Sequence, residues 1–199
     1  MKNLILIATL LVTSFIAVGQ EIVPLETEYS TNLLARDVYF KDVNGVLNKF
    51  IGTWKYQNIN TIFEITFYKR ENISSIHNCT SDDLLAKFKL IINGVEQYNT
   101  YENDYGKLIV SGGFTNYYEY DSVGNVTKIP VSINRYEMSI VEPNFLNSID
   151  ASDLYIEYEN SFGIEKLNWN NEIDESIDYV TGQQVNIYKM PLNMVLIKQ

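Results

Sequence analysis

The single histidine and the single cysteine are the first residues to weigh for chemistry, because a Cys/His pair can supply a nucleophile and its base. His77 and Cys79 stand two positions apart in a polar stretch. On an extended strand such side chains point the same way at a spacing of about 7 Å, which is too far for a hydrogen bond. In a loop they could approach, so a Cys/His enzyme stays open as an alternative. We interpret Cys79 as a buried or incidental residue.

Paired carboxylates are the next candidates, because retaining glycosidases use two carboxyl groups about 5 Å apart. Glu157 and Glu159 share one face of an expected strand, but nothing in the sequence marks them as buried. The acidic stretch 172–178 lacks the alternating spacing of a calcium-binding loop. Gly112-Gly113 precedes no Lys-Ser/Thr of a phosphate-binding loop, and we interpret it as a bulge or bend in a sheet. We therefore predict no catalytic residue, no metal and no cofactor.

Tyrosine is the residue type that favours binding over catalysis, because its apolar ring and polar tip suit the mouth of a ligand site or stacking on a sugar. The chain has 15 tyrosines. Two groups stand out, namely Tyr98, Tyr101 and Tyr105, and then Tyr117, Tyr118 and Tyr120. The alternative is that tyrosine is simply favoured on half-buried strands.

Composition narrows the possible partners. The chain has 199 residues, with 25 Asp or Glu against 15 Lys or Arg and a formal charge of −10. Nucleic acid and anionic membrane surfaces would repel it, so we predict neither as a partner. One His and one Cys exclude a zinc cluster and any disulfide within the chain. The length and the 46% apolar content predict one folded domain.

The first 19 residues have the pattern of a secretory signal peptide. Lys2 is followed by an apolar stretch at 4–16 and by the small residues of Ala17-Val18-Gly19 at the expected cleavage site. The apolar run is shorter than the roughly 20 residues of a bilayer span, although an uncleaved anchor stays open. No Cys follows the site to carry a lipid. We predict a signal peptide at 1–19 and a soluble protein exported to the periplasm or the cell exterior.

The next residues separate an arm from the domain. Residues 20–37 are polar and without periodicity, which predicts a flexible N-terminal arm before a domain at 38–199. A short helix is expected between Asp42 as N-cap and Gly52 as the residue after its end. Its apolar face has the i, i+3, i+4, i+7 spacing of a helix, with Val43, Val46, Leu47 and Phe50.

Strand patterns dominate from residue 53 onward. The alternating run 61–68 pairs with 54–56 through the turn Asn58-Ile59-Asn60. Asn93-Gly94 is typical of a type I′ hairpin turn, and Asn160–Gly163 predicts a third hairpin that joins strands at 154–159 and 164–169. Further strand-like runs lie at 107–111, 115–120, 131–141, 184–190 and 193–198, and 81–90 is interpreted as loop then strand.

This pattern predicts an all-β fold. Antiparallel strands are expected because no long amphipathic helix interrupts them. Closing the sheet removes its edges, so we predict a single antiparallel meander barrel of about 8–10 strands with one short N-terminal helix.

The hairpin at Asn93-Gly94 mixes apolar and amide side chains on one face. In the expected register Ile92 faces Val95, Leu90 faces Gln97 and Phe88 faces Asn99. Such a face suits a cavity, and its alternative is a plain sandwich with the amides at its rim. The predicted ligand-binding lining consists of Phe63, Ile65, Phe67, Phe88, Leu90, Gln97 and Asn99.

A short helix followed by Gly52-Thr53-Trp54 at the first strand resembles the start of a lipocalin-type barrel. In that superfamily the helix closes one end of the barrel, the Trp packs at that end, and a late basic residue lies across it. The resemblance implies that Trp54 and Lys198 form the closed end, with Lys189 as the second choice. From its export signal through KFIGTW to MVLIKQ, the chain resembles a family of small secreted bacterial proteins of unknown function with a lipocalin-like (calycin-type) fold.

Three functions are open at this point. The first is a non-catalytic module that binds a small, largely apolar ligand inside the barrel. The second is a structural or protein-interaction role in the cell envelope, with a filled barrel. The third is an enzyme acting on glycans, which needs two carboxylates in one cleft; we expect no enzyme.

Overall fold

The computed structural model describes residues 20–30, 38–74, 79–102, 109–114, 117–120, 123, 126–129, 131–143, 152–172 and 188–199. Several expectations lie outside these residues, namely the signal peptide at 1–19, the arm at 31–37, His77, Tyr105, the acidic residues 174–178 and most of the strand at 184–190. Within the described residues, no helix has the length and apolar character needed to span a bilayer.

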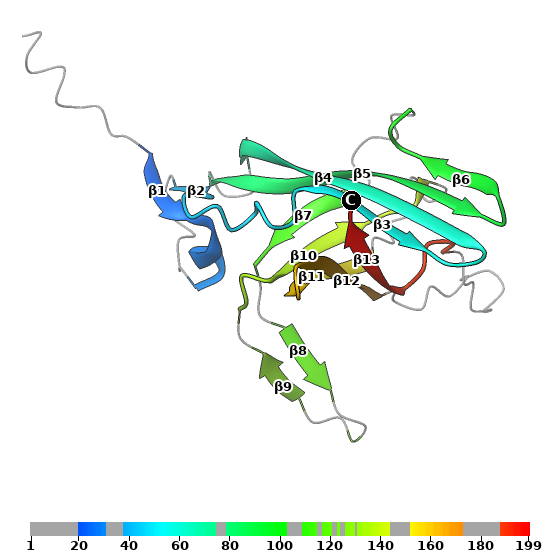
Figure 1. Ribbon diagram of the computed structural model, residues 1–199. Helices are drawn as coiled ribbons and strands as arrows, with labels where there is room; N and C mark the ends of the chain where they lie inside the picture. Colours follow the sequence, from blue (N-terminus) through cyan, green and yellow to red (C-terminus); the bar gives the residue numbers. More distant parts are fainter. Residues whose placement is uncertain are drawn as a thin grey trace, which may run out of the picture.

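The described chain is almost entirely β-structure (Figure 1). Eleven strands form one mixed sheet in the order β1-β2-β5-β4-β3-β13-β12-β11-β10-β7, with β6 paired to β5, and β8 and β9 form a separate hairpin. The strands are β1 Glu21–Pro24, β2 Val38–Lys41, β3 Gly52–Gln57, β4 Thr61–Ser74, β5 Thr80–Ile92, β6 Val95–Asn99, β7 Ile109–Gly113, β8 Tyr117–Tyr120, β9 Val126–Ile129, β10 Arg135–Ile140, β11 Ser152–Ser161, β12 Ile164–Glu172 and β13 Asn193–Lys198. The all-β class is therefore confirmed.

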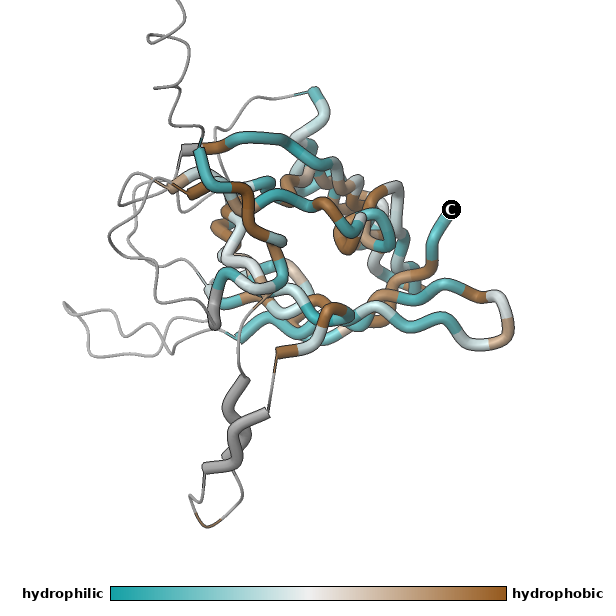
Figure 2. The backbone as a smooth tube through the Cα atoms, turned by 90° about the vertical axis from the view of Figure 1, so that its left-hand side faces the viewer, coloured by the Kyte–Doolittle hydropathy of each residue, from teal (hydrophilic) through white to brown (hydrophobic). Residues whose placement is uncertain are grey.

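The prediction of a closed antiparallel barrel is wrong. The sheet curls (Figure 2) until Cα atoms of β5 and β7 come within 8 Å, but no ladder joins these two strands. The free edge of β5 is instead occupied at its two ends. β2 pairs with it in parallel at Thr80 and Ser81, and β6 pairs with it from Lys89 to Ile92. Two short strands thus take the hydrogen-bonding positions that closure would need, and the parallel pairs make the sheet mixed.

The expected N-terminal helix is also wrong, because the described residues contain no α-helix. The stretch from Asp42 to Phe50 is a chain of turns, with hydrogen bonds from Asn48 N to Gly45 O and from Phe50 N to Leu47 O. Gly45 has φ +65°, which a right-handed helix does not allow, and a Cβ there would lie 2.7 Å from Asn48 Nδ2. The expected apolar face survives in part, since Val46, Leu47 and Phe50 are buried while Val43 is exposed.

All three hairpins are present. β3 pairs with β4, β5 with β6, and β11 with β12. Asn93 and Gly94 have φ of 52° and 75°, as a type I′ turn requires, and Phe162 and Gly163 have 56° and 81°. Local turn chemistry therefore predicted these pairings correctly.

The register of the Asn93-Gly94 hairpin differs from the expectation after its first two pairs. Ile92 faces Val95 and Ile91 faces Glu96, but an irregularity then places Leu90 opposite Tyr98 and Lys89 opposite Asn99. One extra residue on β6 shifts the following side chains, as a bulge does. The predicted Leu90–Gln97 and Phe88–Asn99 pairs are therefore wrong.

Two further segments are more ordered than their patterns indicated. Thr80–Ile92 is one continuous strand, so the loop expected in the first part of 81–90 is absent while the strand that follows it is confirmed. Glu21–Pro24 of the expected arm pairs with β2 in parallel. The predicted bulge at Gly112-Gly113 is confirmed, because Glu137 faces Gly113 and Met138 faces Ser111, which leaves Gly112 unpaired.

Candidate functional site

The apolar residues expected to line a cavity fill the interior instead. Phe63, Ile65, Phe67, Phe88 and Leu90 are 0–1% exposed. A void that admitted water would leave exposed surface on the side chains around it. The rings of Phe63 and Phe88 lie 5.9 Å apart between centroids. These residues therefore form a packed core.

The two amides of the expected lining bind elsewhere. Gln97 Oε1 accepts a hydrogen bond of 2.9 Å from Lys189 Nζ at the surface. Asn99 is buried, and its Oδ1 accepts from Tyr101 N at 3.3 Å. Both amides are thus engaged with other groups of the chain, Gln97 with a lysine side chain and Asn99 with a backbone N–H.

Six buried side-chain atoms lack a hydrogen-bond partner within the described structure, and three of them lie on β12; the others are Glu26 Oε2, Asp42 Oδ2 and Arg70 Nε. Alternation along this strand places Leu167, Trp169 and Asn171 on its buried face, with exposed fractions of 0%, 2% and 3%. Trp169 Nε1, Asn171 Nδ2 and Asn171 Oδ1 have no hydrogen-bond partner within the described structure. We call this group the Trp169–Asn171 pair. An unpartnered buried polar group costs about 1–3 kcal/mol, and native proteins pair at least about nine in ten such groups.

Aromatic and methionine side chains surround the pair. The ring of Trp169 meets that of Phe63 edge to face at 5.3 Å, and Met194 is the cross-strand neighbour of Trp169. Asn171 faces Leu154, which in turn faces Met138. Methionine side chains are flexible and fill or vacate irregular space at low cost. The methionines near the pair can therefore shift at lower cost than branched or aromatic side chains could.

A buried glutamate holds the neighbouring chain segment in place. Glu142 is 0% exposed and accepts hydrogen bonds from Tyr98 Oη at 2.7 Å, Lys189 N at 3.0 Å and Met190 N at 2.5 Å. Burial, followed by the bond to Glu142, raises the pKa of Tyr98 well above its ordinary value. The segment 188–192 is thereby fixed beside β12, where Leu192 O accepts from Asn171 N at 2.8 Å.

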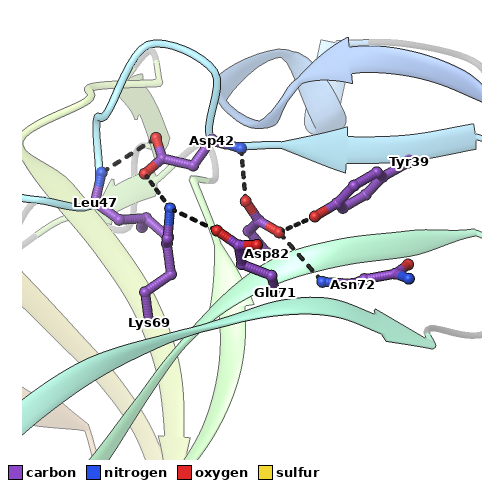
Figure 3. A network of polar contacts seen from close by, with 7 residues as sticks. All are labelled: Tyr39, Asp42, Leu47, Lys69, Glu71, Asn72 and Asp82. Carbon is purple, nitrogen blue, oxygen red and sulfur yellow. Dashed lines mark hydrogen bonds and ion pairs between the residues drawn. The ribbon is translucent and has the colours of Figure 1, made fainter.

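In a second polar cluster, by contrast, a buried carboxylate is hydrogen-bonded by other groups of the chain (Figure 3). Asp82 is 0% exposed and accepts from Tyr39 Oη at 2.5 Å, Asp42 N at 3.0 Å and Asn72 N at 3.2 Å. Burial and the bond to Asp82 raise the pKa of Tyr39 to about 12. Lys69 Nζ lies 3.7 Å from Asp42 Oδ2 in the same group. This Asp82 cluster joins β2, β4 and β5 and is structural.

Trp54 is the fully buried counterpart of Trp169. Its Nε1 donates to Phe50 O at 2.7 Å, and Lys198 Nζ lies 5.2 Å from its ring centroid. Lys198 is therefore the late basic residue across Trp54, whereas Lys189 Nζ lies 5.7 Å from the centroid of the Tyr98 ring.

The described candidates for catalysis do not share a buried site. Glu157 and Glu159 are exposed on the outer side of β11. Cys79 is buried, and its candidate partner His77 lies outside the described residues. Among the described residues, no group of three or more His, Cys, Asp or Glu side chains is arranged to hold a metal ion.

Sequence reasoning missed Trp169, Asn171 and Glu142. The strand 164–169 was expected, and extending its alternation by two residues places Asn171 on the same face as Leu167 and Trp169. An amide on an otherwise apolar strand face was the sequence feature that could have indicated Asn171. No local sequence pattern indicated the role of Glu142, because its hydrogen-bond partners come from segments distant in sequence.

The chain belongs to the family described as "Family of unknown function (DUF6705)", whose model matches residues 1–199. No curated protein and no solved structure matches the chain. Membership in a family of unknown function is thus confirmed. The family match makes no statement on export, and the unclosed mixed sheet replaces the lipocalin-like barrel.

Proposed function

We propose that this protein is an exported, non-catalytic binding protein that holds a small molecule at the Trp169–Asn171 pair. One observation carries the proposal, namely the three unpartnered polar atoms of this pair inside an apolar core. The described part of the chain supplies no partner for these groups, so a molecule from outside that bonds to them recovers the cost of burying them.

The hydrogen-bonding groups of the pair determine which polar group the ligand must carry. Trp169 Nε1 only donates, while the Asn171 amide both donates and accepts. The matching group is neutral and does both, as a hydroxyl or an amide does. The remainder of the ligand is apolar and small, because it must displace methionine side chains such as Met194, which is 6% exposed.

Export is the part of the proposal that rests on the sequence. The pattern of residues 1–19 supports cleavage after Gly19. Intact mass measurement of the protein made in a bacterial host tests this directly. The expected mass is that of a chain beginning at Gln20, and a full-length chain retained in the cytoplasm contradicts export.

A protein-interaction role with a filled interior is the second candidate function. The tight packing of Phe63, Phe67 and Phe88 favours it, since these residues leave no room among themselves. Under this alternative the Trp169–Asn171 pair bonds to an ordered water, and no organic molecule accompanies the protein.

Native mass spectrometry of the protein as purified separates the two candidates. We expect an adduct of a small organic molecule on the wild type and its loss in Asn171→Leu. Asn168→Leu, on the opposite face of β12, is the matched control and keeps the adduct. Titration with 1-hexanol is expected to change the tryptophan fluorescence of the stripped protein, while n-hexane, which lacks the hydroxyl, has a weaker effect. A wild type without adduct or response to 1-hexanol overturns the binding function.

A further inference from the structure

The seam between β5 and β7 lacks backbone pairing along its length. Beside the seam, the hydroxyl of Tyr136 on β10 bonds to Ser111 Oγ on β7. Tyr136 is 1% exposed. The described strands β5 and β7 thus lie close together without the ladder of hydrogen bonds that a closed sheet would have.

The segment Gln20–Ser30, which we call the N-terminal strap, runs across this end of the sheet. β1 pairs with β2, and the 3₁₀ helix η2 (Leu25–Ser30) follows it. Gln20 Nε2 donates to Thr80 Oγ1 at 3.0 Å, and Glu26 Oε1 accepts from Asn44 Nδ2 at 2.5 Å. Leu25 is 1% exposed. The strap thus docks through one buried leucine, one short ladder and polar contacts.

Glu28 is the strap residue that reaches the seam. Its Oε2 lies 3.6 Å from the position that a Cβ on Gly113 of β7 would take. Burial, and then the charge of Asp83 on β5, raise the pKa of Glu28 to about 7. The strap therefore places a carboxyl group whose pKa is raised close to β7, at the seam.

The groups that face Glu28 do little to stabilise the ionised form of its carboxyl group. Asp83 is an acid of the same sign, and Tyr136 carries a pKa raised above its ordinary value by burial, so it stays neutral. A basic residue, Arg70 on β4, is the cross-strand neighbour of Asp83. Ionisation of Glu28 thus adds a second negative charge beside Asp83 in a partly dehydrated site.

We propose that the N-terminal strap is a pH-dependent closure of the β5–β7 seam, docked while Glu28 is protonated and released when Glu28 ionises. The proposal is independent of ligand binding at the Trp169–Asn171 pair. An acid whose pKa is raised in the docked state stabilises docking fully below its undocked pKa, near 4.5, and this stabilisation is lost as the pH rises to about 7.

Hydrogen exchange of the full chain tests the proposal. After correction for intrinsic exchange, the opening equilibrium of β1 and η2 is expected to rise by up to about tenfold per pH unit between about pH 4.5 and about pH 7, and to level off above that. Glu28→Gln, which cannot ionise, is expected to show no such rise. Glu21→Gln, at an exposed strap position, is the control and follows the wild type.

A second variant keeps the test independent of Glu28 itself. Asp83→Asn removes the facing charge, so the rise is expected to span a narrower pH range. Exchange of the strap that does not vary with pH in the wild type overturns the proposal, as does an equal rise in Glu28→Gln.

Discussion

The Asp82 cluster and the Trp169–Asn171 pair are two buried polar regions of one sheet. They differ in whether the described chain supplies hydrogen-bond partners for their side chains. Three groups of the chain donate to Asp82, from β2, the turn that follows it and β4. No described group bonds to the side-chain polar atoms of Trp169 and Asn171. A polar group buried for stability is satisfied from within the chain. Asp42 Oδ2 of the Asp82 cluster also lacks a hydrogen bond, but Lys69 Nζ lies 3.7 Å away as its ion-pair partner. The polar side-chain atoms of the Trp169–Asn171 pair have no hydrogen bond among the described residues, and the proposed binding function depends on that difference.

The two tryptophans show the same difference in hydrogen bonding within a single residue type. Trp54 donates its indole N–H to Phe50 O, whereas Trp169 donates to nothing described. Both are 0–2% exposed. Burial alone therefore does not separate a structural tryptophan from a candidate ligand contact, but hydrogen bonding does.

Among the variants that test this contrast, Asp82→Ala is expected to have the largest effect on the free energy of unfolding. The change leaves Tyr39 Oη, Asp42 N and Asn72 N without an acceptor, so we expect a loss of about 3–5 kcal/mol in the free energy of unfolding. Urea titration measures it. Asp153→Ala, at an exposed position of β11, is the control and is expected to stay within about 0.5 kcal/mol of the wild type. An Asp82→Ala loss as small as that of the control contradicts a structural role for the cluster.

A smaller effect of opposite sign is expected from Asn171→Leu in protein stripped of ligand. Removing unsatisfied groups while keeping an apolar side chain of similar size is expected to raise the free energy of unfolding by about 1–2 kcal/mol. Asn168→Leu serves again as the control. If Asn171→Leu destabilises the stripped protein, the amide already has a partner such as water, and the contrast with Asp82 fails.

The smallest expected effect concerns Trp54. Lys198→Met removes the cation above the ring and the ion pair with Glu165, whose N–O distance is 3.1 Å. We expect a loss of about 0.5–1 kcal/mol, because the lysine is partly exposed and salt screens the pair. Thermal unfolding at low and high salt measures it. Lys55→Met on the neighbouring strand is the control, and equal losses in both variants contradict a specific Lys198–Trp54 contact.

The accuracy of the sequence predictions follows the range of the interactions involved. Asn93-Gly94 specifies its own turn, so the hairpin was predictable from two residues. The helix at Asp42–Gly52 was predicted from apolar spacing, but Gly45 adopts a positive φ that the spacing cannot show. The candidate site was missed because the burial of Asn171 depends on strands far away in sequence, even though its alternation with Trp169 was visible.

By itself the sequence determined the all-β class, the three hairpins and the bulge at Gly112, because each depends on side-chain alternation or on the backbone freedom of neighbouring residues. Only the tertiary structure decided that the sheet stays open between β5 and β7, that Glu28 lies close to Gly113 of β7, and that the Asn171 amide is buried without a partner among the described residues. Those outcomes depend on which strand edges meet and which groups lose contact with water. Such competition between distant segments leaves no local pattern in the chain.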